Sequence, residues 1–138
     1  MELNVNSPAY YSRNYYIDNE VYRMCQGLYV FMKSKQYSEV LKVIGIIPVV
    51  APEEVLKDSS CWREHLEFRG KNEVATVWIH INFDDYHSGD SDTKKALMLD
   101  AIIKSIESIS KKSKIKFNLE KFREDILYFS KEMRIVAQ

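Results

Sequence analysis

The sequence lacks most features that would reveal its chemistry directly. Its two cysteines, Cys25 and Cys61, are too few for a disulfide framework and too far apart for a zinc site. No Gly-rich phosphate loop, nucleophile elbow or Ser/His/Asp order is visible. We therefore expect no cofactor, no metal and no catalytic residues of these kinds.

Long hydrophobic segments are missing too. The longest apolar stretch, 43–52, is interrupted by Gly45 and Pro48 and is far below the roughly 20 residues that cross a bilayer. The first residues have neither the basic start nor the apolar core of a signal peptide. These absences predict a cytoplasmic protein with no membrane partner.

The chain has no excess of either charge, because 20 Lys and Arg balance 20 Asp and Glu. This balance argues against a dedicated nucleic-acid binder, which needs a net basic footprint. The zero net charge nevertheless results from regions of opposite charge that cancel. Residues 53–92 hold ten acids against four bases, and residues 93–116 hold seven bases against two acids. We therefore expect a polar surface with separate acidic and basic regions.

What remains is the composition of an ordinary globular domain. Of the 138 residues, 46% are apolar and 29% are charged. A chain of this length buries enough surface to fold without disulfide or metal, so residues 1–138 are expected to form a single domain.

Hydrophobic periodicity predicts the elements of that domain. Strands are expected over 2–6 and 41–50, the second with a bend or a pairing edge near Pro48. Helices are expected over 15–35, 93–112 and from Asn118 onward, with Ser91 or Asp92 as the N-cap of the second. The order β-α-β-β-β-α-α predicts an α+β fold, with an antiparallel sheet of about four strands and helices packed on one face.

The clearest local signal is a hairpin formed by 61–69 and 74–83. Core residues are even-numbered in the first strand and odd-numbered in the second. Residues that lie opposite each other must point to the same face, so an even-numbered residue must pair with an odd-numbered one. A two-residue loop at Lys71-Asn72 meets this condition and sets His65 opposite Trp78.

Arg69, Trp78 and His80 are then expected on the outer face of the hairpin, together with His65. Two histidines on one face could act as a general acid and base. The other readings are a solvated face and a binding surface. The binding surface is favoured over catalysis because Trp is costly to expose, and Trp and Arg dominate interface energetics.

An acidic connection follows the hairpin and contains Asp84, Asp85, His87, Asp90 and Asp92. These side chains could bind a divalent metal, and a small metal-dependent hydrolase using His80, Asp84, Asp85 and His87 is one alternative function. The spacing matches no calcium loop, and the favoured interpretation is the exit of a strand followed by helix capping, in which carboxylates lie at the positive end of the helix dipole.

Two further patterns concern the helices. Tyr15, Tyr22 and Tyr29 recur every seven residues, which places them in one stripe that either flanks the core or docks a partner, as in a generic adaptor module or a self-associating protein. The run of Lys111, Lys112, Lys114 and Lys116 resembles a basic patch. Such a run usually ends a helix and stays solvated, and we expect no aromatic residues among it.

Four segments in order along the chain resemble landmarks of the immunity protein 44 family of bacterial polymorphic toxin systems. They are Val43-Ile44-Gly45-Ile46-Ile47-Pro48, Ile79-His80-Ile81-Asn82-Phe83, Ala101-Ile102-Ile103-Lys104-Ser105-Ile106 and Phe122-Arg123-Glu124-Asp125-Ile126-Leu127. One departure is Asn82, where the pattern leads us to expect an acidic residue.

The resemblance implies a non-enzymatic antidote that binds a cognate toxin domain and neutralises it by stoichiometric occlusion. The candidate contact residues are Arg69, Trp78, His80, Asp84, Asp85, Asp90 and Asp92, with Tyr15, Tyr22 and Tyr29 as a secondary interface. An acidic region could imitate phosphate toward a basic nuclease toxin, which predicts salt-sensitive association.

Overall fold

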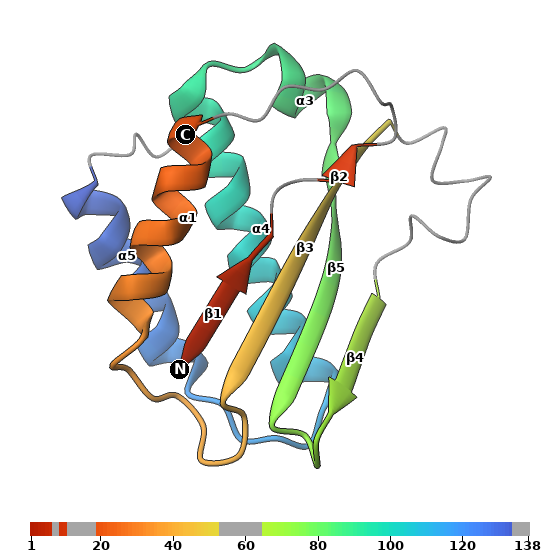
Figure 1. The fold of residues 1–138 in the computed structure, drawn as a ribbon, viewed down its shortest axis with the longest axis vertical. Helices are drawn as coiled ribbons and strands as arrows, with labels where there is room; N and C mark the ends of the chain where they lie inside the picture. Colours follow the sequence, from red (N-terminus) through yellow and green to blue (C-terminus); the bar gives the residue numbers. More distant parts are fainter. Residues whose placement is uncertain (7–8, 11–18, 53–64, 134–138) are drawn as a thin grey trace.

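The computed structural model describes residues 1–6, 9–10, 19–52 and 65–133 (Figure 1). The strands are β1 (Glu2–Val5), β2 (Ala9–Tyr10), β3 (Val43–Ala51), β4 (His65–Arg69) and β5 (Val74–Asn82). The helices are α1 (Asn19–Met32), α3 (Phe83–Ser88), α4 (Ser91–Lys112) and α5 (Leu119–Glu132). None of these helices is long and apolar enough to cross a membrane.

The sheet is mostly parallel, so the predicted antiparallel sheet is wrong although the α+β class is confirmed. Its order is β1-β3-β5-β4, and the short β2 also pairs with β3. Strands β1 and β5 both run parallel to β3, and only β4 and β5 are antiparallel. The error arose because β5, and not β4, takes the position next to β3. A hairpin predicted in isolation does not say which of its strands joins the rest of the sheet.

Pro48 lies where β3 changes partners. The β1 register ends at Ile46 and the β2 register begins at Val49, while β5 pairs with β3 along its whole length. Proline has no N–H to donate to a ladder, which suits a position between two partners. Pro48 thus lies where one side of β3 changes partner, but β3 is a central strand and not a sheet edge, because β5 pairs with it throughout.

The hairpin has the predicted register, with His65 opposite Trp78. Its turn is closed by a hydrogen bond from the Glu73 N–H to the Gly70 carbonyl (3.2 Å). Lys71 and Asn72 between them have φ angles of 57° and 69°. Positive φ at both central residues is the feature of a type I′ turn, whose twist matches that of the strands.

The helix termini are set by side-chain caps. The carboxylate of Asp90 accepts from the Thr93 N–H and begins α4, so the expected cap at Ser91 or Asp92 is wrong by a residue or two. Asn118 caps α5 as predicted. The connection 84–92 also holds the short helix α3, which the sequence did not suggest because it is a single amphipathic turn and a half with one buried residue, Tyr86.

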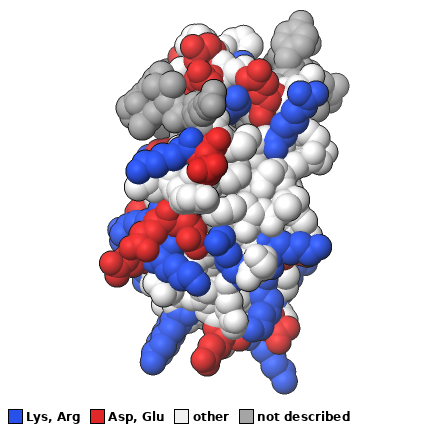
Figure 2. All heavy atoms as spheres, turned by 90° about the vertical axis from the view of Figure 1, so that its left-hand side faces the viewer, with Lys and Arg blue, Asp and Glu red and all other residues white. Residues whose placement is uncertain are grey.

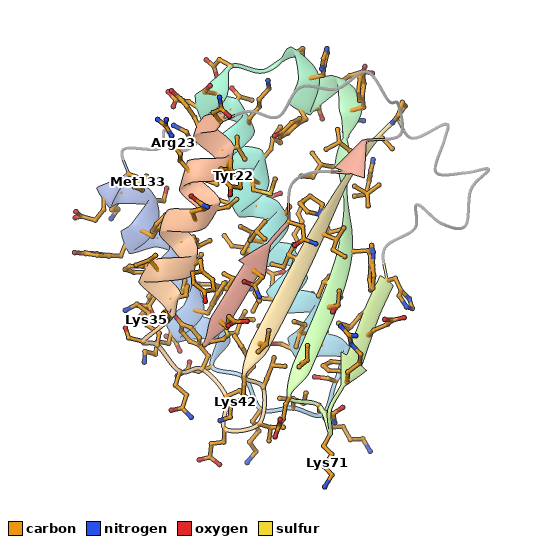
Figure 3. All side chains as sticks on the ribbon, viewed as in Figure 1. Tyr22, Arg23, Lys35, Lys42, Lys71 and Met133 are labelled. Atoms are coloured by element: carbon orange, nitrogen blue, oxygen red, sulfur yellow. The ribbon has the colours of Figure 1, made fainter. Side chains whose placement is uncertain are left out.

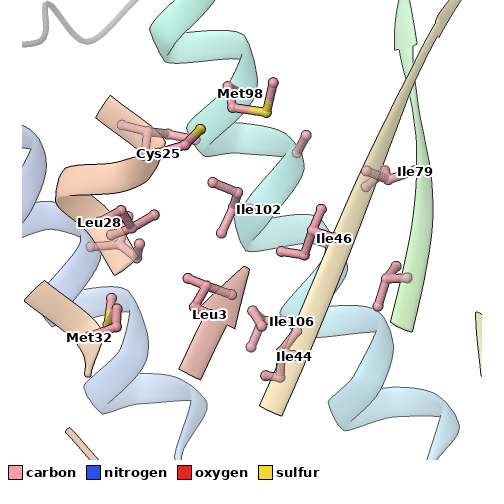
Figure 4. Packing of buried hydrophobic residues seen from close by; sticks show 14 of the residues in the cluster. Leu3, Cys25, Leu28, Met32, Ile44, Ile46, Ile79, Met98, Ile102 and Ile106 are labelled. Carbon is pink, nitrogen blue, oxygen red and sulfur yellow. The ribbon is translucent and has the colours of Figure 1, made fainter. Parts of the chain in front are cut away.

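All the longer helices lie on one side of the sheet (Figure 1). The core lies between the two layers, where alternate residues of the strands meet the apolar stripes of α1 and α4 (Figure 4). Its fully buried residues include Leu3, Ile44, Ile46, Leu28, Ile102 and Ile106. Helix α5 adds Phe122, Ile126 and Phe129 from the outer side.

Candidate functional site

The first candidate site is the opposite face of the sheet, which we call the open face because none of the described helices covers it. Residues alternate along the strands, so each residue next to a core residue points to this side. The open face includes Glu2, Asn4, Val43, Gly45, Ile47, Thr76, Trp78, His80, His65, Glu67 and Arg69, and toward the C-terminal end of β3 it also includes Val49 and Ala51, which are only 3% and 0% exposed.

Trp78 lies in the middle of the open face and is half-buried. The His65 ring is tilted against it with centroids 5.4 Å apart, and His65 Nε2 lies 3.2 Å from a carboxylate oxygen of Glu67. On the other side Trp78 is paired with Ile47 of β3. The result is an apolar centre with charged residues on the edge strand, which is the composition of many protein interfaces.

His80 is on the same face but is less free than the sequence suggested. Its Nε2 lies 2.7 Å from the carbonyl oxygen of Ala51 at the end of β3. One ring nitrogen of His80 is therefore engaged by the backbone. The other histidine, His65, lies opposite Trp78, which is two residues before His80 on β5. The two histidines do share a face, as predicted, but each has a structural partner of its own.

The acidic residues lie beyond the end of β5. Asp84 and Asp85 are exposed in the first turn of α3, and Asp92 is exposed in the first turn of α4. Asp90 is also exposed, and the hydrogen bonds that it accepts from Thr93 lower the pKa of its carboxyl group below the usual range. The capping interpretation thus holds for Asp90. Asp92 lies 3.9 Å from the Lys95 ammonium, and the region that holds the four carboxylates is here called the acidic end.

The role of Asn82 in the structure accounts for the absence of an acidic residue at this position. Its side-chain oxygen accepts a hydrogen bond from the Asp85 N–H (3.1 Å) and caps α3. Asparagine and aspartate are equally good N-caps, so the expected acid is not needed for this structural task.

The structure does not assemble the residues of the hydrolase hypothesis. No group of three or more His, Cys, Asp or Glu side chains among the described residues could hold a metal ion. His87 is stacked on Phe83 with centroids 5.0 Å apart, whereas His80 faces Ala51. The hypothesis of His80, Asp84, Asp85 and His87 as a joint metal site is therefore wrong.

The tyrosine stripe is only partly exposed. Tyr15 lies outside the described residues, Tyr22 is 48% exposed, and Tyr29 is half-buried with its hydroxyl 3.5 Å from Glu2. A stronger apolar surface lies on the outer sides of α1 and α5, where Val30, Leu127 and Tyr128 are 70%, 56% and 57% exposed. The sequence signal was present, since Leu127 and Tyr128 lie outside the core stripe of α5.

A further candidate surface lies at the end of the molecule opposite α3. It is a groove of about 1320 Å³ between the loop that follows α1 and the segment that joins α4 to α5. Lysine side chains project from this end (Figures 2 and 3). Sequence reasoning found the Lys111–Lys116 run but not its contact with Tyr37, which is distant in the chain and stacks on Phe117 directly after the run (5.6 Å between centroids).

The model of the family described as immunity protein 44 matches residues 1–132 of the chain. The chain belongs to the immunity protein 44 family. Neither the curated proteins nor the solved structures contain a match.

Membership of the immunity protein 44 family places the chain in polymorphic toxin systems, where an immunity protein implies a cognate toxin as its partner. Immunity proteins are typically non-enzymatic. This agrees with the expectation of no catalytic residues, and it directs attention to surfaces that bind proteins.

Proposed function

We propose that this immunity protein neutralises its cognate toxin by binding the toxin domain in a stoichiometric complex that covers or distorts the toxin's active site. The partner contacts would come from the open face, through Arg69, Trp78 and His80, and from the acidic end, through Asp84, Asp85, Asp90 and Asp92.

The position of Trp78 is the main observation that supports this choice of surface. Trp78 occupies the centre of a sheet face that the described helices leave uncovered, with Ile47 beside it and His65 against its ring. Tryptophan is the residue type most enriched among interface residues whose truncation costs the most binding energy. Half-burial in the free protein also means that part of its ordering entropy is already lost before the partner arrives.

The acidic end supplies the electrostatic part of the proposal. Asp84, Asp85 and Asp92 are exposed, and they share this end of the molecule with the carboxylate of Asp90. Such a group attracts a basic partner and orients it before contact, which raises the association rate more than the final affinity. A toxin that acts on nucleic acid would present a basic surface of this kind.

The test uses the toxin domain encoded beside this gene, in a catalytically inactive form. The affinity of the wild-type chain is compared with that of Trp78→Ala and of an Asp84→Lys, Asp85→Lys pair. We expect Trp78→Ala to weaken binding by at least about 2 kcal/mol, as for interface hot spots. The charge reversals should mainly slow association.

Two variants serve as controls. Leu127→Ala removes an exposed apolar side chain from α5, and Glu124→Lys reverses an exposed charge on the same helix. Both should leave affinity and protection of toxin-producing cells unchanged. Equal affinity of Trp78→Ala and the wild type would remove the open face from the binding site, and loss of binding in Leu127→Ala would move the site to the helices.

A further inference from the structure

The groove opposite α3, whose end of the molecule is here called the basic end, is built mainly by two segments that are distant in the chain. One comprises residues 36–40 after α1, and the other comprises residues 112–118 at the end of α4. The Asn118 N–H donates to the Tyr37 carbonyl (2.8 Å) and holds the two segments together. In the wall behind this contact Tyr37 stacks on Phe117 and Phe122 meets both rings edge-on, so the groove rests on packed side chains.

The groove is strongly basic. Its charged lining residues are four lysines, Lys112, Lys114, Lys116 and Lys121, against the single acid Glu39. A neighbouring hollow of about 340 Å³ shares Gln36 and Ser38 with it and adds Lys33, Lys35 and Lys42 against Glu2. The seven lysines of these two hollows face two carboxylates, so this end of the molecule carries a large local positive charge.

The lysines of the 112–116 segment are free to meet a partner. Exposure alternates along this segment, with Ser113, Ile115 and Phe117 turned inward and the lysines turned out. Among the described residues, Lys112, Lys114 and Lys116 have no carboxylate within ion-pair distance. Like charges so close together repel one another, and an anionic partner would relieve that repulsion.

The lining favours an acidic polypeptide over a nucleic acid. Single-stranded nucleic acids are bound by aromatic rings that are free to stack on bases. Here Tyr37 is only 4% exposed and is stacked with Phe117, and the Lys121 ammonium lies over its ring at 5.6 Å from the ring centre. The remaining lining includes the side-chain amides of Gln36 and Asn72, which suit peptide backbone groups.

We propose that this groove binds an acidic segment of the cognate toxin polypeptide, as a second contact separate from the open face. The inference rests on the proposed function, because that function supplies a protein partner. The chain then meets its toxin with an acidic end and a basic end at once. A partner of complementary polarity is thereby aligned in one orientation before the apolar centre at Trp78 is covered.

The first experiment measures the binding of labelled peptides to the full chain by fluorescence anisotropy at low salt. Oligoglutamate is the probe, and oligoglutamine and oligothymidylate of equal length are the comparisons. We expect oligoglutamate to bind most tightly. The pair Lys114→Glu, Lys116→Glu should weaken its binding about tenfold or more, because two attractive contacts become repulsive.

Two variants separate charge from other effects. Lys114→Arg, Lys116→Arg keeps the charge and should bind within about twofold of the wild type. Lys131→Glu, an exposed reversal in the last turn of α5, should do the same. Tighter binding of oligothymidylate, or equal loss in Lys131→Glu, would overturn the inference.

The second experiment measures affinity for the inactive toxin domain. The Lys114→Glu, Lys116→Glu chain should bind the toxin more weakly than the wild type, and the arginine pair should not. Unchanged toxin affinity of the glutamate pair would overturn this inference while leaving the proposed function intact. If the wild-type chain itself fails to bind the toxin, the proposed function falls.

Discussion

The Tyr37 hydroxyl donates a hydrogen bond to a carboxylate oxygen of Asp125 at 2.6 Å, which joins the loop after α1 to the middle of α5. The two residues are 88 positions apart in the chain. Tyr37 is buried and Asp125 is partly buried, so the bond lies between a core ring and the surface of the outer helix. It also fixes the aromatic wall of the basic groove.

Tyr37→Phe should therefore lower stability with little change in the fold. Loss of one hydrogen bond to a carboxylate predicts a decrease of about 2 kcal/mol in the free energy of unfolding at neutral pH. Burial, and then the hydrogen bond to Asp125, raise the pKa of Tyr37 above its ordinary value. A raised pKa stabilises the folded state fully below about pH 10, the unfolded value, and this stabilisation is lost as pH rises further.

Urea unfolding at neutral and alkaline pH checks both parts. Tyr37→Phe should show a shallower loss of stability above about pH 10 than the wild type, since it has no phenol at this site to ionise. Tyr22→Phe is the control, because Tyr22 is exposed and, among the described residues, its hydroxyl accepts from Gln26 on the same helix. An equal effect of the two substitutions would contradict the assigned role of Tyr37.

The hairpin turn offers a stabilising substitution. Lys71 and Asn72 both have left-handed backbone conformations, which cost energy in residues with a side chain. Replacing them by Asn-Gly, the preferred type I′ pair, should raise the free energy of unfolding by about 1 kcal/mol. The matched change Asn72→Val should lower it. Thermal unfolding of the three proteins is the measurement, and a stabilising Asn72→Val would contradict the turn type.

The cap of α3 predicts how Asn82 variants behave. Asn82→Asp keeps an oxygen that can accept from the Asp85 N–H, so its stability should equal that of the wild type. Asn82→Ala removes the cap and should cost about 1 kcal/mol. Denaturant unfolding distinguishes them, with Asn118→Ala at the start of α5 as a second uncapped helix for comparison. If Asn82→Asp weakens toxin binding without changing stability, the residue has a role in the interface as well.

The salt dependence of association tests the separation of charge between the two ends. Surface charges are screened over about 10 Å at 0.1 M salt, so oriented encounter with the toxin should slow markedly as salt rises. Stopped-flow measurement of the association rate over a salt series gives the slope. The Lys114→Glu, Lys116→Glu chain should show a smaller slope than the wild type, and an association rate that does not depend on salt would reject electrostatic steering.

Local features of the fold were predictable because they depend on residues near one another in the chain. The register of His65 with Trp78 follows from alternation and loop length, and the start of α5 follows from Asn118 before an apolar stripe. The face shared by Trp78 and His80 is a consequence of the same alternation. The family landmarks were also readable, since they are local patterns spread along the chain.

The direction of the sheet was harder to predict, although one signal existed. Strand β3 is a nearly continuous apolar run with both faces buried in its second half, as is usual for parallel strands. Its interruption by Gly45 and Pro48 predicted a bend or a pairing edge near Pro48 instead. The structure shows that Pro48 lies between two partners on one side of a central strand, an arrangement that requires knowledge of where β1 and β2 pair.

By itself, the sequence determined the longer helices and strands, the register of the hairpin and the family, because each depends on spacing within a few residues. Only the tertiary structure decided which strands are neighbours, that His80, Asp84, Asp85 and His87 do not form one site, and that lysines of 112–121 share a groove with Tyr37. These depend on contacts between segments far apart in the chain. Such contacts are set by the packing of the whole core, and no local pattern encodes them.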